Sequence, residues 1–474
     1  MFCLRISVMS LKSIIIRKHM AFIIVASALL NSLYAGSVPI TYSKAIQLAL
    51  ANNPKIQAAQ ASIEAAAGAS KQADSMSWPQ LGLEVSGART DNPMSVFGYK
   101  LSQGNASFAD FGANEYTGLN TLYTKPQALN HPGYYSNLDT AFKLSVPIYS
   151  GGRIKAQQAQ MRALVASAQR GNQQAQNQLA YEVYTSYERF LTANQLVSVA
   201  KRQVARARAF LSTTKALKKQ SITLDSDELM AEAYLNNSLI GLSNAKIQTE
   251  DELDGFRTLL GAPGSPFVPS RHTNLTATIK LNSALINHAL KDNPSIKALH
   301  ARLQSEKAAI AASQALYKPQ VSMQLRHDWN GNTLGSGLPS DTIALGANWT
   351  LFSAGERAGA VQVASAHAKN IQFELDEQRN QLRLQLKQIQ RAERQTRYEL
   401  QLSRQTAEKE EMVIQKLKQR FGRGLVPLSA LLESQMKLTQ SKAQELQALH
   451  QLRVHEAQWL MLSNQLISKT IKSA

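Results

Sequence analysis

An internal repeat is the feature that most limits what this chain can fold into. A constant shift of 240 positions aligns Asn53-Pro54 with Asn293-Pro294, and farther along a shift of 203 positions aligns Gly152 with Gly355. The change of shift gives the first copy 37 additional residues between its first strand and its long helix. The chain therefore contains one structural unit twice.

The repeat sets the expected division of the chain. The first copy covers residues 36–262 and the second covers residues 282–466, with strands expected at about 80–90 and 140–149, and at about 320–329 and 342–352. Residues 263–281 contain three prolines at three-residue spacing and are typical of a linker. Residues 467–474 form a short C-terminal tail.

Residues 1–35 are typical of an export signal. A basic stretch precedes eleven mostly apolar residues from Met20 to Leu30, and small residues follow. Cleavage is expected after Ala35 or Ser37, and Met9 is an alternative start. A membrane anchor would need about 20 apolar residues. The single cysteine, Cys3, lies in this segment, so we expect the exported chain to have no thiol for a lipid anchor or a disulfide.

Composition excludes a disordered or collagen-like chain, because 44% of the residues are apolar and only 18% are charged. Lys and Arg (52) exceed Asp and Glu (33), which gives a formal net charge of +19. Such a balance raises nucleic acid, anionic membranes and acidic proteins as partners. Export from the cytoplasm argues against nucleic acid.

The order of elements is the same in both copies. Asn53-Pro54 begins a helix, and near Pro79 the apolar period changes from the helical spacing to two, which predicts a strand hairpin. Strands of about ten residues cross a membrane when they are tilted. The pattern alone leaves a small soluble sheet open as the alternative.

Long helices fill the rest of each copy. Residues 153–219 contain no proline and extend about 100 Å as a helix, and a shorter helix follows to about Leu260. The second copy repeats this arrangement at about 356–421 and 428–463. The narrow apolar stripes of these helices suit coiled-coil packing more than a filled core. Four strands cannot close a barrel, so several copies would have to share one.

These features resemble the TolC-like outer-membrane efflux and secretion family. The matching motifs are the repeated Ala-Leu-x-x-Asn-Pro-x-Ile at 49–56 and 289–296, the Pro-Gln that enters a strand, and the segments 146–153, 349–356 and 226–232. The resemblance implies a mainly α fold with membrane β structure. It comprises an internally duplicated α-barrel of long helices and a 12-stranded transmembrane β-barrel shared by a homotrimer, four strands per chain.

The resemblance also implies a function, a location and partners. The chain would be the channel component of a tripartite efflux or type I secretion system in the outer membrane of a Gram-negative bacterium. It would contact outer-membrane lipid, a periplasmic adaptor protein, and a proton-driven or ATP-driven inner-membrane pump. The loops between the strands would face the outside of the cell. The exported substrate is not readable from the sequence.

Candidate site residues follow from the same resemblance. The turns after the long helices would touch the adaptor through Ser221, Ile222, Gly424, Leu425 and Val426. Gly424 matches a family glycine, whereas the first copy has Ser221 there.

An entrance constriction would involve Asp227, Phe421 and Glu433. Phe421 stands where family members have tyrosine, and Ala430 stands where they have aspartate, so a hydroxyl-mediated latch is expected to be absent. The closed state would then depend on packing. Helix capping is the alternative role of Asp227 and Glu433.

A basic stretch near the end of the long helix provides one hypothesis beyond the resemblance. Between Lys201 and Lys219 there are seven basic residues and no acidic one. Outward-facing cations would attract an acidic adaptor, inward-facing cations would favour anionic cargo, and a solvated face needs no partner. The candidate patch consists of Arg206, Arg208, Lys215, Lys218 and Lys219.

No enzyme motif stands out in the sequence. It contains no phosphate-binding glycine loop, nucleophile elbow or His-Glu-x-x-His, and we expect no catalytic activity, cofactor or metal. The principal alternative to a channel is a periplasmic coiled-coil adaptor or spacer without a pore. Such a protein would need no membrane-spanning hairpins.

Overall fold

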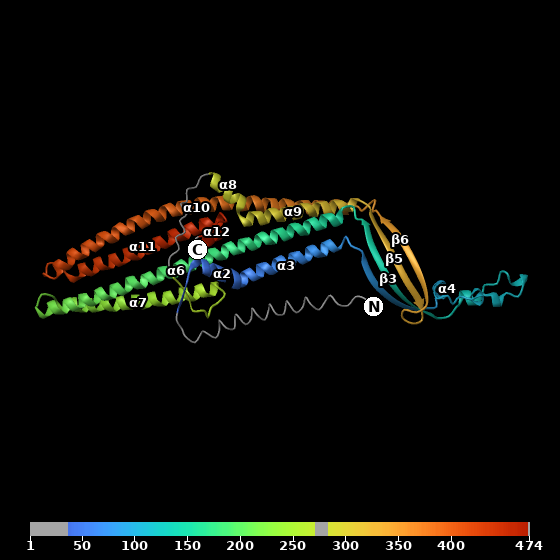
Figure 1. Ribbon diagram of the computed structural model, residues 1–474, viewed down its shortest axis with the longest axis horizontal. Helices are drawn as coiled ribbons and strands as arrows, with labels where there is room; N and C mark the ends of the chain where they lie inside the picture. Colours follow the sequence, from blue (N-terminus) through green and yellow to red (C-terminus); the bar gives the residue numbers. More distant parts are fainter. Residues whose placement is uncertain (1–36, 271–282, 473–474) are drawn as a thin grey trace. The chain divides into compact units, whose positions relative to one another are not determined.

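The computed structural model describes residues 37–270 and 283–472 (Figure 1). The expected signal at 1–35 and the second half of the expected linker lie outside the described residues. The chain forms two compact units. The helical unit takes its described residues from Met1–Ala58, Gln173–Asn293 and Gln381–Ala474, and the sheet unit comprises Ala59–Asn172 and Pro294–Asn380.

Both copies of the repeat have the same order of elements, as the sequence predicts. The helix expected to begin at the Asn-Pro pair does so in each copy, and a short helix that was not expected precedes it. The elements of the first copy are α2 (Tyr42–Asn52), α3 (Pro54–Ser75), β2 (Gln80–Thr90), β3 (Tyr135–Tyr149), α6 (Arg153–Lys219) and α7 (Asp225–Leu259). Those of the second are α8 (Ser283–Asp292), α9 (Pro294–Gln314), β5 (Gln320–Gly331), β6 (Leu338–Asn348), α10 (Glu356–Phe421) and α11 (Leu428–Leu462).

Four details differ from the sequence-based expectations. Strand β3 begins at Tyr135 and not near 140, so it is five residues longer than expected. Strand β6 spans Leu338–Asn348 and not about 342–352, because Asn348 pairs with Gln320, the first residue of β5. Beyond the strand, Arg357 binds the carbonyl groups of Thr350 and Leu351. The expected linker contains a strand, β4 (Phe267–Pro269), which pairs in parallel with β1 (Val38–Ile40). The expected tail begins with helix α12 (Leu466–Lys472).

The repeated Asn-Pro pair closes the helical unit in the same way in both copies. The side-chain Nδ2 of Asn53 donates to the carbonyl of Leu259 at 2.9 Å, and Nδ2 of Asn293 donates to the carbonyl of Leu462 at 3.1 Å. Each asparagine therefore satisfies a carbonyl that the end of α7 or α11 leaves without a helical partner. Proline then begins the next helix, where its missing N–H is not needed.

Tyrosines fill the core of the helical unit beside β1. Tyr42 donates its hydroxyl to the carbonyl of Ala180 at 3.0 Å, and Tyr187 donates to the carbonyl of Ile40 at 3.0 Å. Tyr42 also makes edge contacts with the rings of Tyr184 and Tyr187, and Phe256 contacts Tyr187 from α7. These rings bury large apolar areas, and the hydroxyls of Tyr42 and Tyr187 are satisfied by the two backbone carbonyls.

A four-stranded antiparallel sheet is the main feature of the sheet unit. Its order is β2-β3-β5-β6, so the two hairpins join through β3 and β5. Strands β2 and β6 form the two edges, and neither has a further strand beside it within the described part of the chain. Between β2 and β3 the first copy carries a long loop with two short α-helices, α4 (Pro93–Ser102) and α5 (Gln127–Asn130), and three 3₁₀ turns between them, where the second copy has a short turn.

Among the described residues, no helix is both long enough and apolar enough to cross a lipid bilayer.

Candidate functional site

The turns that end α6 and α10 have matching backbone conformations. Ser221 adopts a φ of 61° and Gly424 a φ of 69°, both in the left-handed region. The N–H of Ile222 binds the carbonyl of Leu217, and the N–H of Leu425 binds the carbonyl of Arg420, each at 3.0 Å. This six-to-one bond after a left-handed residue is the Schellman ending of a helix. The serine of the first copy therefore forms the same turn as the glycine of the second.

The two turns also lie against each other. A Cβ atom on Gly424 would be 3.2 Å from Cγ2 of Ile222, so the glycine leaves room for the facing isoleucine. Ile222 and Leu425 are exposed apolar residues, whereas Val426 packs against a buried cluster beneath them. The structure thus brings the five expected contact residues together at one end of the helical unit.

An apolar cluster lies directly beneath these turns. It joins all four long helices of the helical unit and contains Ala207, Phe210, Leu217, Ala231, Tyr234, Ala407, Ile414, Phe421, Leu428, Leu431, Leu432 and Leu438. Phe421, an expected constriction residue, is buried within it with only 3% of its surface exposed. Its ring is one part of the packing that joins the two helix pairs.

The two acidic residues expected at the constriction have local partners. Asp227 Oδ2 accepts the N–H of Leu224 at 3.3 Å, which caps the start of α7. Glu433 pairs with Lys437 one helical turn along α11 at 2.9 Å, and this hydrogen bond lowers the pKa of Glu433. Both positions therefore have a structural explanation that needs no gate.

The expected basic patch divides into paired and free cations. Arg206 lies 3.5 Å from Glu411 of α10. Lys215 and Lys218 pair with acids of α7, and Glu228 is shared by both. Hydrogen bonding to Asp225 and Glu228 raises the pKa of Lys218. In the described chain, Arg208 and Lys219 have no ion-pair partner, and they are exposed.

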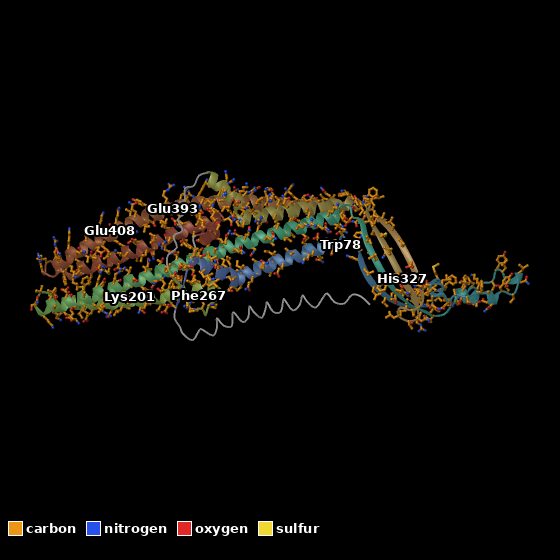
Figure 2. All side chains as sticks on the ribbon, in the orientation of Figure 1. Trp78, Lys201, Phe267, His327, Glu393 and Glu408 are labelled. Atoms are coloured by element: carbon orange, nitrogen blue, oxygen red, sulfur yellow. The ribbon has the colours of Figure 1, made fainter. Side chains whose placement is uncertain are left out.

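The two free cations line one groove on the surface of α6 and α7. The groove has a volume of about 480 Å³ and is bordered by Arg208, Lys215, Lys219, Leu211 and Leu235. Cations above an apolar floor suit a partner segment that is both acidic and apolar. Lys201 lies on the same helix α6, farther from the turn than the groove (Figure 2).

A buried polar group that the sequence analysis missed lies deeper in the helical unit. Glu188 of α6 is completely buried and binds Nη1 of Arg453 on α11 at 2.9 Å. Nearby, burial raises the pKa of Glu456 to about 7, and burial lowers the pKa of His455. In sequence, Glu188 sits in a helix of mixed charge, where only contacts between distant helices reveal its burial.

The sheet has one apolar and one polar face. Alternate residues such as Leu83, Phe142, Leu325 and Ile343 form an apolar face that is largely exposed. Aromatic residues stand at both ends of the sheet, with Trp78 just before β2 and Trp329 beside His327 at the far end (Figure 2). An exposed apolar face between aromatic belts is typical of a lipid-facing surface.

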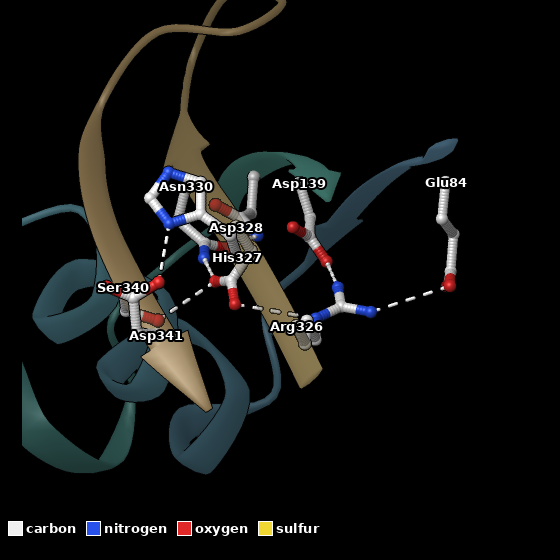
Figure 3. A network of polar contacts seen from close by, with 9 residues as sticks. Glu84, Asp139, Arg326, His327, Asp328, Asn330, Ser340 and Asp341 are labelled. Atoms are coloured by element: carbon white, nitrogen blue, oxygen red, sulfur yellow. Dashed lines mark hydrogen bonds and ion pairs between the residues drawn. The ribbon is translucent and has the colours of Figure 1, made fainter. Parts of the chain in front are cut away.

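The opposite face carries a charged network centred on Arg326 of β5 (Figure 3). Its guanidinium pairs with Asp139 of β3, with Glu84 of β2 at 3.5 Å and with Asp328 at 3.4 Å. On the apolar side, His327 binds Asp341 at 2.6 Å. One cation thus ties three strands together on the polar face, as expected for a wall that faces water.

A family model for outer membrane efflux proteins matches residues 45–262 and 285–462. The chain belongs to this outer membrane efflux protein family. The two matched ranges correspond closely to the two copies found by the internal repeat. Family membership confirms the resemblance and makes the chain a transport protein of the outer membrane.

Solved structures of outer membrane channels share the fold. The structure of CusC is 15% identical with a TM-score of 0.76, covering 91% of this chain and 95% of that one. The CmeC outer membrane channel of Campylobacter jejuni is 14% identical with a TM-score of 0.72, covering 91% and 88%. The open MtrE channel of Neisseria gonorrhoeae is 16% identical with a TM-score of 0.72, covering 92% and 93%. No curated protein sequence gives a match.

Proposed function

We propose that this outer membrane efflux protein is one subunit of a homotrimeric duct. The duct conducts substrates from an inner-membrane transporter across the periplasm and the outer membrane. The observation that carries the proposal is the four-stranded sheet, which has one apolar face, one polar face and two open edges. An open edge in lipid leaves backbone groups without hydrogen-bond partners at several kcal/mol each.

Assembly removes these open edges. If β2 of one copy pairs with β6 of the next, three copies supply twelve strands and close a barrel with its apolar face toward lipid. An even number of at least eight strands is the rule for bacterial barrels of this kind. The polar face with Arg326 would then line the water-filled interior.

Two further partners complete the proposal. A periplasmic adaptor would bind the turns at Ser221, Ile222, Gly424, Leu425 and Val426, with Arg208 and Lys219 as the free cations of the basic patch. An inner-membrane pump, driven by protons or by ATP, would select the substrate. Both efflux and type I secretion fit this architecture, and the duct needs neither catalysis nor a cofactor.

The expected processing and division of the chain belong to the same proposal. Residues 1–35 would be removed on export, and residues 36–262 and 282–466 would form the two repeats. Residues 263–281 would connect them, and residues 467–474 would follow as a tail. Sequencing the N-terminus of the purified protein would identify the cleavage site.

The test is the assembly state of protein extracted from outer membranes with detergent. A complex of three chain masses that forms conducting pores in planar bilayers supports the duct. A stable single subunit that stays in solution without detergent contradicts it and favours an adaptor or spacer without a pore. The solved channels that share the fold favour the duct over that alternative.

A further inference from the structure

The loop between β2 and β3 is an ordered structure and not a simple connection. The cap residue Asn92 accepts the N–H of Ser95 at the start of α4, and Lys100 pairs with Asp110 at 2.5 Å. That hydrogen bond lowers the pKa of Asp110 to about 2. Glu115 accepts the first two N–H groups of α5, at 2.8 and 3.0 Å. The 37 additional residues of the first copy therefore build a defined surface.

Gln103 fixes the base of this loop to the sheet. Its Nε2 donates to Asn137 Oδ1 at 2.8 Å and to the carbonyl of Ser136 at 3.0 Å, and its Oε1 accepts the hydroxyl of Tyr135 at 2.8 Å. Asn137 in turn donates to Asn330 at 2.8 Å, and Asn330 donates to Asp328 at 2.7 Å.

This chain of hydrogen bonds runs across the polar face of the sheet. Asn137, Asn330 and Asp328 belong to the same face as Arg326, and the buried side chain of Gln103 joins them from the loop. The loop is thus anchored on the side that would face the interior of the duct, and not on the apolar side. From this anchor it extends beyond the end of the sheet (Figure 1).

The far part of the loop exposes many apolar side chains. Tyr123 is 94% exposed, Phe108 is 87% exposed and Leu119 is 81% exposed. Next to Leu119 and Tyr123 in the sequence lie residues that line a hollow of about 210 Å³, among them Phe108, Phe111, Tyr116 and Leu122. An apolar surface of this kind on an ordered loop is a sign of a binding partner.

The charge of the loop is compatible with contact between the same loops of neighbouring copies. Residues 91–134 contain three acidic and two basic residues, and the Lys100–Asp110 pair neutralises two of the five charges. Copies of a nearly neutral surface can meet without strong repulsion. In a ring of three subunits, each contact joins two different surfaces, one from each neighbour. The protruding side chains and the hollow provide two such surfaces on one loop.

We propose that residues 91–134 cap the outer mouth of the duct by packing against the same loop of the neighbouring copies. Leu119 and Tyr123 of one copy fill the hollow around Phe111 and Tyr116 of the next. This inference rests on the proposed trimer, because the open edges β2 and β6 place neighbouring copies on either side of each loop.

Cross-linking between two differently tagged chains tests the contact. The exported chain is expected to have no cysteine, so one chain with Tyr123→Cys is co-expressed with another that carries Tyr116→Cys. Mild oxidation should form a disulfide between the two differently tagged chains. The control pair is Tyr123→Cys with Tyr134→Cys, and its yield should be about tenfold lower, because only cysteines that lie close together have a high effective concentration. Tyr134 is an exposed aromatic of the same loop on the apolar side.

A second measurement tests the cap. Ser86→Cys places a thiol on the polar face of β2, and a bulky maleimide polymer is added to whole cells. Phe108→Ser, Leu119→Ser and Tyr123→Ser together change only exposed side chains and should speed labelling about tenfold by opening the mouth. Equal labelling rates, or no cross-link in a complex with the mass of a trimer, would overturn the cap and leave the duct intact. Failure to obtain a trimer would instead contradict the proposed function.

Discussion

The two copies of the repeat agree where a helix must end and differ where the helices face different surroundings. Asn53 and Asn293 make the same bond to the ends of α7 and α11, and Ser221 and Gly424 form the same turn. The helix endings therefore match, because the backbone leaves the same groups unsatisfied in each copy. A duplicated chain retains such solutions even when the side chains around them change.

The long helices show the opposite behaviour. Glu188 of the first copy is completely buried, whereas the equivalent Arg391 of the second copy is exposed. Arg453 of the second copy binds Glu188, and its equivalent in the first copy is the exposed Glu250. Divergence after duplication has thus produced a bond between the copies that neither could form alone. This difference can be tested by substitution.

Removal of Arg453 should have the largest effect. Arg453→Ala leaves the fully buried carboxylate of Glu188 without its cation, and the loss of one partner of a buried pair costs about 3–5 kcal/mol. The expected result is a clear fall in the urea midpoint of the purified protein in detergent. Glu250→Ala changes the equivalent exposed position and should shift stability by less than about 0.5 kcal/mol. Similar losses in both variants would refute the asymmetry.

The next largest effect concerns pH. Glu456 lies where the first copy has Leu253, and burial raises its pKa to about 7 despite Arg397 at 3.8 Å and Arg453 nearby. Glu393 adds to the rise, and burial lowers the pKa of the neighbouring His455. Between pH 4.5 and 7 the folded state therefore keeps a proton that the unfolded state releases. Stability must then fall as the pH rises through this window.

Glu456→Gln should remove that fall. We expect the variant and the native protein to be equally stable near pH 4, and the variant to be more stable at pH 8 by on the order of 2 kcal/mol. His455 titrates in both proteins, so its contribution cancels in the difference between their two stability curves. Parallel curves from pH 4 to 8 would show that Glu456 ionises normally.

The shared helix endings should give equal, smaller losses. Asn53→Ala and Asn293→Ala each remove the bond to a terminal helix carbonyl, at an expected cost of about 1–2 kcal/mol apiece. Gln57→Ala, at an exposed position of α3, is the control and should change little. Thermal unfolding of the three variants under one set of conditions makes the comparison. Clearly unequal losses for the two asparagines would mean that the same residue contributes differently to the stability of the two copies.

The sequence predicted most of the fold because its signals are local. The change of apolar period at Pro79 marks the first strand, and the Asn-Pro pairs and the glycines mark helix boundaries. The family model and the shared fold of solved channels confirm the channel architecture. The inner order of the long loop was not predicted, because Gln103 reaches its partners only once the sheet exists.

Side-chain roles near the turns depend on contacts that sequence spacing does not encode. The sequence predicted the basic patch as one surface. In the structure, Lys215 and Lys218 pair with acids of the neighbouring helix, whereas Arg208 and Lys219 have no ion-pair partner among the described residues. Phe421 read as a constriction residue, and its burial depends on helices that are distant in the chain. Whether these residues bind an adaptor or narrow an entrance stays a prediction.

The smallest expected effect tests the backbone of the turns directly. Ser221 holds a left-handed φ of 61°, which costs a residue with a Cβ atom about 1 kcal/mol relative to glycine. Ser221→Gly should therefore stabilise the protein slightly, whereas Gly424→Ser should destabilise it and press its side chain against Ile222. Ser212→Gly, about two turns before the end of α6, should cost about 1 kcal/mol because glycine weakens a helix. Replacement of serine by glycine should therefore stabilise the protein at position 221 and destabilise it at position 212. A loss of stability in Ser221→Gly would mean that the serine side chain contributes something at this turn that the glycine of the second copy does not.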